Sequence, residues 1–478
     1  MSLLFYLIST GIVGCGVFLL NGYLLSIRTG IKWISFLPMI MNSRTMHQYI
    51  ANASKNDPIV MQYLGIGNHV ILCDTESIKF VLRNDNKFVK MIAPTTECIK
   101  EFVGKNVMNT NGDEYEFHKA PIMQFLSNTS VKSFEDKMTR QAENLVDILS
   151  NYVDKEINIG NFMVDFTFDV LSDTILGIDI GASNDVVELS HAIEVFTREI
   201  TNPMYMLVPG YEKLPIQSNR ELKHSIDVLQ KYIEKIIREK EGKSVDQYDL
   251  IDCILENSKN SNELMNGVFG NIITLIIAGH DTTAISLKWV MYYLSIHLDI
   301  QTQLYNDIKE GHESELMQNV FKETMRMMPP VALVPTRTCT EDIYFTHSNG
   351  KTYTFKKGSF ISYSIWAVHR NEKIWNNPGE WMPSRWTSSS LFQHNAGSSS
   401  LMEESLSRQH NDSYMPFSTG KRPCLGKQFA IQEQRIVLTE ILKKFEIHSE
   451  GNHLSSLELK PGIFAEPKKV IVKLTLRN

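Results

Sequence analysis

One ten-residue stretch near the carboxyl end constrains this chain more than any other. Between Phe417 and Gly426 lie two glycines, a proline and a single cysteine, and a helical pattern of apolar residues follows at once. Cys424 should therefore lie where a tight loop meets the first turn of a helix. Backbone N–H groups are unpaired at such a position and the helix dipole is positive, so we expect the thiolate to be favoured over the thiol.

A thiolate held by such a loop is a soft metal ligand. The sequence around Cys424 has no second cysteine or histidine, which argues against a zinc tetrad and is compatible with one axial bond to haem iron. The alternative is a buried structural cysteine in a glycine-rich turn. The stretch resembles the haem-binding loop of the cytochrome P-450 superfamily at Phe417, Gly420, Arg422, Cys424 and Gly426. The resemblance implies that Cys424 is the proximal iron ligand and that haem b is the cofactor.

A second motif interrupts the longest predicted helix, residues 262–296. Residues 278–283 read Ala-Gly-His-Asp-Thr-Thr within an otherwise apolar stretch. Glycine weakens a helix, and threonine can bond the carbonyl four residues earlier, which opens the backbone ladder locally. Such a notch can face a cofactor that binds oxygen; the alternative is a helix with a polar outer face. The motif resembles the distal-helix motif of the superfamily, in which an acid–alcohol pair, here Asp281 and Thr282, delivers protons during oxygen activation.

A third motif lies between the other two. Glu323 and Arg326 are three residues apart and share one face of a predicted helix. Alone, such a pair is usually an exposed ion pair that contributes about 0–1 kcal/mol. It resembles the Glu-x-x-Arg motif of the superfamily, a structural pair that also engages a later arginine, here Arg385. Ser384 stands where the superfamily usually has an acid, so one charge of this structural network is absent.

Haem propionates require cationic donors, which arginine and lysine supply best. Arg422 in the cysteine loop is one candidate, and Arg337 is a second by its position. The superfamily also has Trp-x-x-x-Arg in an early helix, and the matching residues are Tyr115, His118 and Lys119. Tyrosine and lysine replace tryptophan and arginine, so the charge is kept and the planar fork is lost. The alternative for each basic residue is an ordinary solvated charge.

The amino terminus predicts membrane attachment. Residues 1–27 carry no charged side chain, and this length exceeds the ~20 residues that span a bilayer. Arg28 and Lys32 follow, so the positive-inside rule places the rest of the chain in the cytosol. We therefore expect a transmembrane anchor at 1–27, a membrane-proximal linker at 28–56 and one catalytic domain at 57–478, in the endoplasmic reticulum membrane as a single-pass protein. The alternative for 1–27 is a buried helix.

The net charge limits the expected partners, and the cysteine spacing limits the expected cellular compartment. The net charge of −6 makes nucleic acid a poor partner. The six cysteines show no paired spacing, which favours a reducing compartment over a disulfide framework.

Periodicity predicts a mostly α protein with small β-sheets, and the resemblance implies the cytochrome P-450 fold, with haem between the long distal helix and the cysteine loop. A hairpin is predicted at 59–64 and 69–73, followed by a helix from Asp74 or Thr75 to about Leu82. Short strands are expected between 341 and 363 and in 457–476. Longer helices are predicted at 113–126, 131–153, 161–176, 185–199, 217–241, 248–257, 262–296, 299–309, 314–327 and 425–444. Residues 387–413 are rich in Ser, Asn, Gln and His and predict a surface loop of no assigned function.

The resemblance implies a monooxygenase that inserts one atom of O2 into a small apolar, lipid- or terpenoid-like substrate. The chain has no dinucleotide fingerprint, so electrons would come from NADPH through a separate membrane-bound haemoprotein reductase. Lys421, Lys427 and Lys119 are candidates to contact that reductase. Two alternatives remain open at this stage: a reductase-independent haem-thiolate isomerase or dehydratase, and a catalytically silent haem-binding membrane protein.

Overall fold

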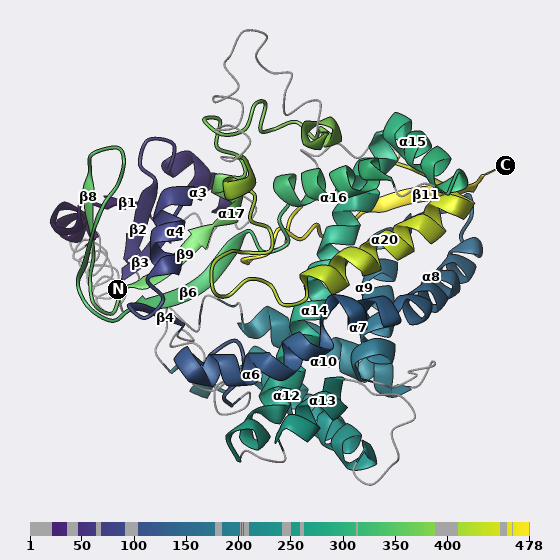
Figure 1. Cartoon of the computed structure of the whole chain (residues 1–478), viewed down its shortest axis with the longest axis horizontal. Coiled ribbons are helices and arrows are strands. Elements are labelled where there is room, and N and C mark those ends of the chain that lie inside the picture. The colour runs from purple at the N-terminus through teal and green to yellow at the C-terminus, as the bar shows by residue number, and fades with distance from the viewer. Residues whose placement is uncertain are drawn as a thin grey trace, which may run out of the picture.

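A computed structural model describes residues 22–35, 46–63, 68–90, 104–176, 184–200, 202, 204, 210–240, 250–258, 262–311, 314–387, 410–449, 457–460 and 462–477. It shows a mostly helical body with small sheets, which confirms the predicted fold class. The largest sheet and its covering helices lie on one side in Figure 1, and the long helix α14 (Asn262–Ile296) runs through the helical part. The predicted surface loop 387–413 falls almost wholly outside the described residues.

The largest sheet has six strands in the order β1-β2-β3-β9-β6-β4. The predicted hairpin is present as antiparallel β2 (Ile59–Tyr63) and β3 (Asn68–Leu72), with Ile59 opposite Leu72. β9 (Phe360–Ser364) pairs with β3 in parallel, and β6 (Leu333–Cys339) pairs antiparallel with both β9 and β4 (Phe88–Lys90). This sheet brings Lys90 directly opposite Arg337. Two smaller sheets comprise β7 (Ile343–Thr346) with β8 (Thr352–Phe355), and β10 (Phe445–His448), β11 (Ile471–Leu476) and β5 (Glu156–Asn158).

Most predicted helices are present within one or two residues. The remaining helices are α4 (Thr75–Arg83), α6 (Gly112–Phe125), α7 (Asn128–Ser133), α8 (Glu135–Ser150), α9 (Ile159–Leu171), α10 (Asn184–Ile200), α12 (Gln217–Lys240), α13 (Leu250–Ser258), α15 (Leu298–Lys309), α16 (Glu315–Met327), α17 (Ile365–Val368) and α20 (Lys427–Lys444).

Two predicted helices have an irregularity. The helix predicted at 131–153 is divided into α7 and α8 at Phe134, whose ring packs 5.1 Å from that of Phe125. The helix predicted at 161–176 ends in a π-helical turn, Ser172–Leu176, in which Thr174 donates to the carbonyl of Val170 at 2.6 Å. Hydroxyl back-bonding of this kind competes with the regular ladder.

The body begins earlier than predicted. Residues 28–56, expected as a linker, supply β1 (Lys32–Trp33), which pairs with β2, and α3 (Met46–Ala53), which buries Met46 and Ile50 in the core. Their apolar side chains explain the difference, since a free linker would expose them. Only 22–27 of the predicted anchor lies within the described residues, and 22–29 are helical.

The helix α14 organises the core. Its Trp289, Val290 and Leu294 are fully buried, and it packs against α9, α13 and α16. Within the described part of the chain, the one segment long and apolar enough to cross a membrane is Gly267–Ile296, and 56% of its most apolar window is buried. Its packing inside the body identifies it as a core helix.

Candidate active site

The cysteine loop is held in a defined shape before α20 begins. The backbone N–H of Cys424 donates to the carbonyl of Phe417 at 2.8 Å, closing the loop on itself. Gly420 has φ +80°, and a Cβ there would lie 3.3 Å from Leu82, so glycine suits both the backbone and the space. Ser418 also has a positive φ of 60°, and its hydroxyl lies 2.8 Å from that of Tyr363 on β9. The loop is thus fixed to the large sheet.

The electrostatics of Cys424 differ from the expectation drawn from the helix dipole. Burial raises the pKa of the Cys424 thiol, although the N–H of Gly426 and the charge of Lys427 act in the opposite direction. The Cys424 side chain is exposed, so this effect comes from protein atoms packed near the sulfur and not from its enclosure. A bound metal ion would supply the charge that holds the sulfur as a thiolate.

The 278–283 segment of α14, which we call the notch, contains the threonine bond that the sequence predicts, although α14 runs as one continuous helix through it. The hydroxyl of Thr282 donates to the carbonyl of Ala278 at 2.8 Å. Gly279 makes room for Leu171 on α9, because a Cβ there would lie 2.6 Å from Cδ1 of Leu171 and that side chain would have to move. The absence of a side chain at this position therefore lets α9 and α14 approach closely.

Asp281, the acid of the distal motif, pairs with its neighbour His280 on α14. Its carboxylate lies 2.9 Å from Nδ1 of His280, and the Asp281 side chain is 22% exposed. Burial raises the pKa of Asp281, but hydrogen bonds from His280 and Thr197 and the charges of His280 and Lys288 together lower it below the usual value. Asp281 is thus a carboxylate at neutral pH.

The Glu323 carboxylate is fully buried at the centre of a network that α16 and η5 (Pro383–Trp386) share. Arg326 donates to both of its oxygens, at 2.8 and 2.9 Å, and Arg385 donates at 3.3 Å. The indole N–H of Trp386 also donates to Glu323, at 3.0 Å. The structure therefore brings the three motif residues together. Trp386, two residues after the uncharged Ser384, adds a further donor to Glu323.

A cluster of cations lies between the large sheet and α6, made of Lys90, Arg337 and Arg422. Arg337 donates to the carbonyl of Phe88 at 2.7 Å, and Arg422 donates to the carbonyl of Thr110. Desolvation together with the charges of Arg337 and Arg422 lowers the pKa of Lys90 to about 7, and desolvation lowers that of Arg422 to about 10.

Tyr115 completes one side of this cation cluster. The guanidinium of Arg422 lies 3.8 Å from the centre of its ring. Buried like charges in one place are costly unless an anion joins them. The donor set fits the two carboxylates of a haem, which would provide that anion while Cys424 binds the iron.

The other two early-helix candidates lie in different surroundings. His118 is buried, and its Nδ1 contacts the Asn271 side-chain amide of α14 at 3.1 Å. A Cβ on Gly267 would lie 2.3 Å from its ring, so His118 seats α6 against α14. Lys119 pairs with Glu116 at 3.1 Å on the surface of α6, and its ammonium also lies 5.4 Å from the centre of the Tyr115 ring. The structure thus groups Tyr115 with the cation cluster, keeps Lys119 beside Tyr115 and places His118 at the contact between α6 and α14.

The sequence interpretation missed three side chains next to these motifs: Lys90, Tyr363 and His280. Lys90 and Tyr363 belong to strands that the sheet brings to the cysteine loop. The sequence gives no local signal for the pairing of these distant strands. His280 lies inside the distal motif and could have been noticed, because a buried histidine beside an acid is an unusual pair in an apolar helix.

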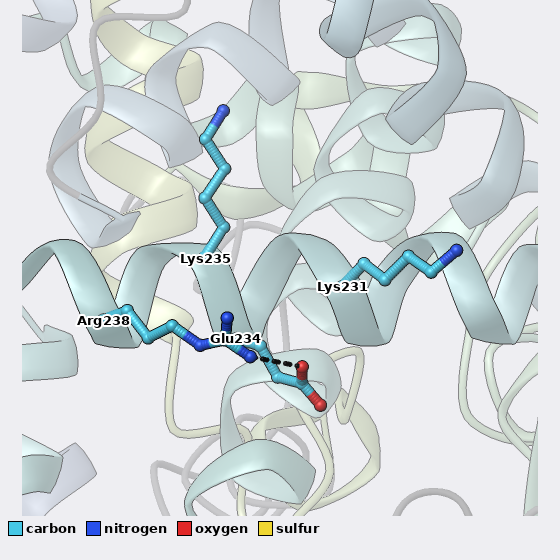
Figure 2. A pocket seen from close by; sticks show the side chains of 4 residues that line it. All are labelled: Lys231, Glu234, Lys235 and Arg238. Atoms are coloured by element: carbon cyan, nitrogen blue, oxygen red, sulfur yellow. Dashed lines mark hydrogen bonds and ion pairs between the residues drawn. The ribbon is translucent and has the colours of Figure 1, made fainter.

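The hollows found on the described surface do not contain these residues. Figure 2 shows one on α12, lined by Lys231, Glu234, Lys235 and Arg238. Arg238 pairs with Glu234 at 3.2 Å, whereas Lys231 and Lys235 point in different directions. A single helix face of this kind encloses no ligand.

Comparisons with known proteins agree with this geometry. The family model described as Cytochrome P450 matches residues 28–474. Cytochrome P450 4V2 of Homo sapiens is 24% identical over 88% of this chain and 83% of its own length. Cytochrome P450 6B7 of Helicoverpa armigera is 22% identical over 86% of this chain and 84% of its own.

A named hydroxylase and a solved structure match as well. The cytokinin hydroxylase of Arabidopsis thaliana is 23% identical over 86% of this chain and 79% of its own length. The crystal structure of a cytochrome P450, CYP102L1, aligns with a TM-score of 0.73 and 17% identity, covering 91% of this chain and 95% of that one. The chain therefore belongs to the cytochrome P450 family, whose members are haem-thiolate monooxygenases, and haem b is its cofactor.

Proposed function

We propose that this enzyme oxygenates a small apolar, lipid- or terpenoid-like substrate with electrons that a separate NADPH-dependent haemoprotein reductase supplies. The observation that carries the proposal is that one folded body contains three parts: the cysteine loop, the notch of α14 and the cation cluster. When bound, haem supplies the oxygen-activating redox chemistry.

The protein groups have separate roles. Cys424 would bind the haem iron through its sulfur, and Phe417, Gly420 and Gly426 shape its loop. Asp281 and Thr282 would move protons on the distal side, with water linking the carboxylate to the hydroxyl. Lys90, Arg337, Arg422 and Tyr115 would hold the propionates. The network of Glu323, Arg326 and Arg385 is structural, because its polar atoms are engaged with one another and with backbone carbonyls.

The apolar substrate is supported by apolar side chains that the core covers only in part. Leu275 and Ile277 on α14 are only partly buried against the core. Val331 forms a β-bridge with Phe464, so the chain just after α16 lies beside the carboxyl-terminal turn. Apolar side chains from three distant segments are typical of a pocket for an apolar ligand. The names of the relatives do not agree on one substrate.

Membrane attachment and reductase docking are part of the proposal. The apolar segment 1–27 would anchor the chain in the endoplasmic reticulum bilayer, with the catalytic domain in the cytosol. Lys427 is exposed beside the cysteine loop, and Lys421 pairs with Asp85 at 3.0 Å while remaining 68% exposed. These lysines could receive an acidic reductase surface.

The test is turnover of the full chain in lipid nanodiscs with NADPH, a haemoprotein reductase and a panel of lipids and terpenoids under isotopically labelled O2. We expect a product that carries one labelled oxygen, formed only when the reductase is present. Conversion of a hydroperoxide without reductase would assign the chain to the isomerase or dehydratase class instead. Absence of any substrate-induced spectral change or product across the panel would indicate a silent haem protein.

Reductase docking has its own test. We expect reductase-supported turnover to fall as salt is raised, because screening weakens attraction between exposed charges. Unchanged turnover would end the electrostatic docking proposal without affecting the assignment of the reaction.

A further inference from the structure

His280 occupies the position between Gly279 and Asp281, and both of its ring nitrogens contact oxygen atoms. Nδ1 lies 2.9 Å from Oδ1 of Asp281, and Nε2 lies 3.2 Å from the backbone carbonyl of Val164 on α9. The ring is buried, with 3% of the residue exposed, and meets Phe168 edge-on at 5.7 Å. The imidazole is therefore fixed between two helices.

These contacts determine how many protons the pair carries. A backbone carbonyl only accepts hydrogen bonds, so Nε2 must be protonated. The contact between Nδ1 and Asp281 then needs a second proton, either on Nδ1 or on the carboxyl group. A neutral imidazole with a proton only on Nε2 would present a lone pair to a carboxylate, and the two would repel. A neutral histidine and an ionised aspartate together carry one proton, on Nε2. The contacts are consistent with a pair that carries one further proton, between Nδ1 and the carboxylate.

The surroundings keep the Asp281 side of this pair ionised. Lys288, on the same helix, helps to keep the pKa of Asp281 below its usual value. Lys288 itself pairs with Glu466 at 2.7 Å. On α9, burial raises the pKa of Asp165, while the charge of His280 acts in the opposite direction. Among the described residues, the charged groups that act on the pair are Asp165 on α9 and Lys288 on α14, and Lys288 is itself paired with Glu466.

We propose that His280 is a positioning residue that holds Asp281 and keeps one exchangeable proton on the His280–Asp281 pair, beside Thr282. This inference rests on the proposed roles of Asp281 and Thr282. The proton moves from Nδ1 of His280 to Oδ1 of Asp281, and the resulting carboxylic acid gives it to water or hydroxyl at the notch. Asp281, which is partly exposed, then takes up a proton from solvent, and the pair returns to its starting charge.

The test compares the wild type with His280→Gln and with His224→Gln, a control at an exposed histidine of α12. Glutamine can donate a hydrogen bond to Asp281, but it cannot carry the extra proton. Hydrogen peroxide released per NADPH consumed is measured with the reductase across pH, which needs no knowledge of the product. The ring-nitrogen NMR shifts of ¹⁵N-histidine-labelled protein, assigned by the signal lost in His280→Gln, report the protonation of His280 independently of turnover.

We expect both ring nitrogens of His280 to be protonated at neutral pH and to lose that state as pH rises. Peroxide yield in the wild type and in His224→Gln should rise over the same pH range. In His280→Gln it should be several-fold higher at low pH and independent of pH. An unprotonated nitrogen at neutral pH, or a His280→Gln profile like that of the wild type, would overturn the inference.

Failure of the underlying function has a different signature. If Thr282→Ala also leaves peroxide yield unchanged, protons do not pass through this notch and the proposed roles of Asp281 and Thr282 fail. If Thr282→Ala raises the peroxide yield while His280→Gln does not, only the inference about His280 fails. The reduced carbonyl spectrum of each variant shows that haem remains bound through sulfur.

Discussion

The Tyr363 hydroxyl on β9 lies 2.8 Å from the Ser418 hydroxyl in the cysteine loop. The two residues are 55 positions apart in the chain, and Ser418 has a backbone conformation that L-residues rarely adopt. This contact links the loop that carries Cys424 to the sheet that carries the cation cluster, so it sets one side of the cofactor site relative to the other.

We expect Tyr363→Phe to destabilise the haem-loaded protein by about 1 kcal/mol, the usual net contribution of one hydrogen bond. Thermal unfolding followed at the haem absorbance measures the change. Ser418→Ala is the matched variant from the other side, and the double variant should be no less stable than the worse single one. Additive losses would show that the two hydroxyls act separately.

Cys424→Ser should abolish the long-wavelength Soret band of the reduced carbonyl complex, because that band requires a thiolate ligand. The measurement is a reduced carbonyl difference spectrum of the purified protein. Cys253→Ala, which removes a buried cysteine of α13, should keep the band. A band that survives in Cys424→Ser would end the assignment of the ligand.

Thr282→Ala should leave haem bound and divert reducing equivalents to hydrogen peroxide, because the variant lacks the hydroxyl that passes protons to the notch. Peroxide released per NADPH consumed should rise several-fold. Thr282→Ser keeps a hydroxyl that can reach the carbonyl of Ala278, and its yield should stay near that of the wild type. Equal yields in all three proteins would show that protons arrive by another route.

Lys90 should make haem retention depend on pH. Protein groups alone lower its pKa to about 7, and contact with a propionate would raise it, so haem binding is accompanied by proton uptake above about pH 7. Retention should therefore weaken as pH rises from neutral. Haem transfer to apomyoglobin measures it: Lys90→Ala should lose haem faster at every pH, whereas Lys90→Arg, which stays charged, should show little dependence on pH. Identical transfer rates would remove Lys90 from the propionate site.

Glu433 on α20 predicts a second pH effect. Both carboxyl oxygens are buried and have no hydrogen-bond partner in the described part of the chain, and burial raises the pKa of Glu433 well above its usual value. A raised folded-state pKa means that the native protein holds this proton more tightly, so stability falls as pH rises above the unfolded pKa. Glu433→Gln should remove this fall, as measured by urea unfolding from acid to alkaline pH.

Glu440→Gln on the same helix changes a carboxylate that pairs with Lys443 near the surface. This control should keep the pH dependence of the wild type. A Glu433→Gln protein with that same dependence would contradict the prediction.

Local patterns were sufficient for most of the helices and for the first hairpin. Asp74 caps α4 through the backbone N–H groups of Glu76 and Ser77, as its sequence position indicates. The three motifs could also be found, because each consists of residues close together in the chain.

Contacts between distant strands could not be predicted in this way. β4 and β6 are short, and their pairing places Lys90 beside Arg337 across almost 250 residues. The pKa of Cys424 is subject to a related limit: it depends on protein atoms that the fold packs near the loop, whereas a helix terminus is visible in the local sequence.

The close approach at Gly279 has a consequence for how related sequences vary. Because a Cβ at position 279 would lie 2.6 Å from Cδ1 of Leu171, alanine at 279 requires the leucine side chain to move. A smaller side chain at 171 would remove that requirement. An alignment of orthologues should therefore show covariation between these two positions.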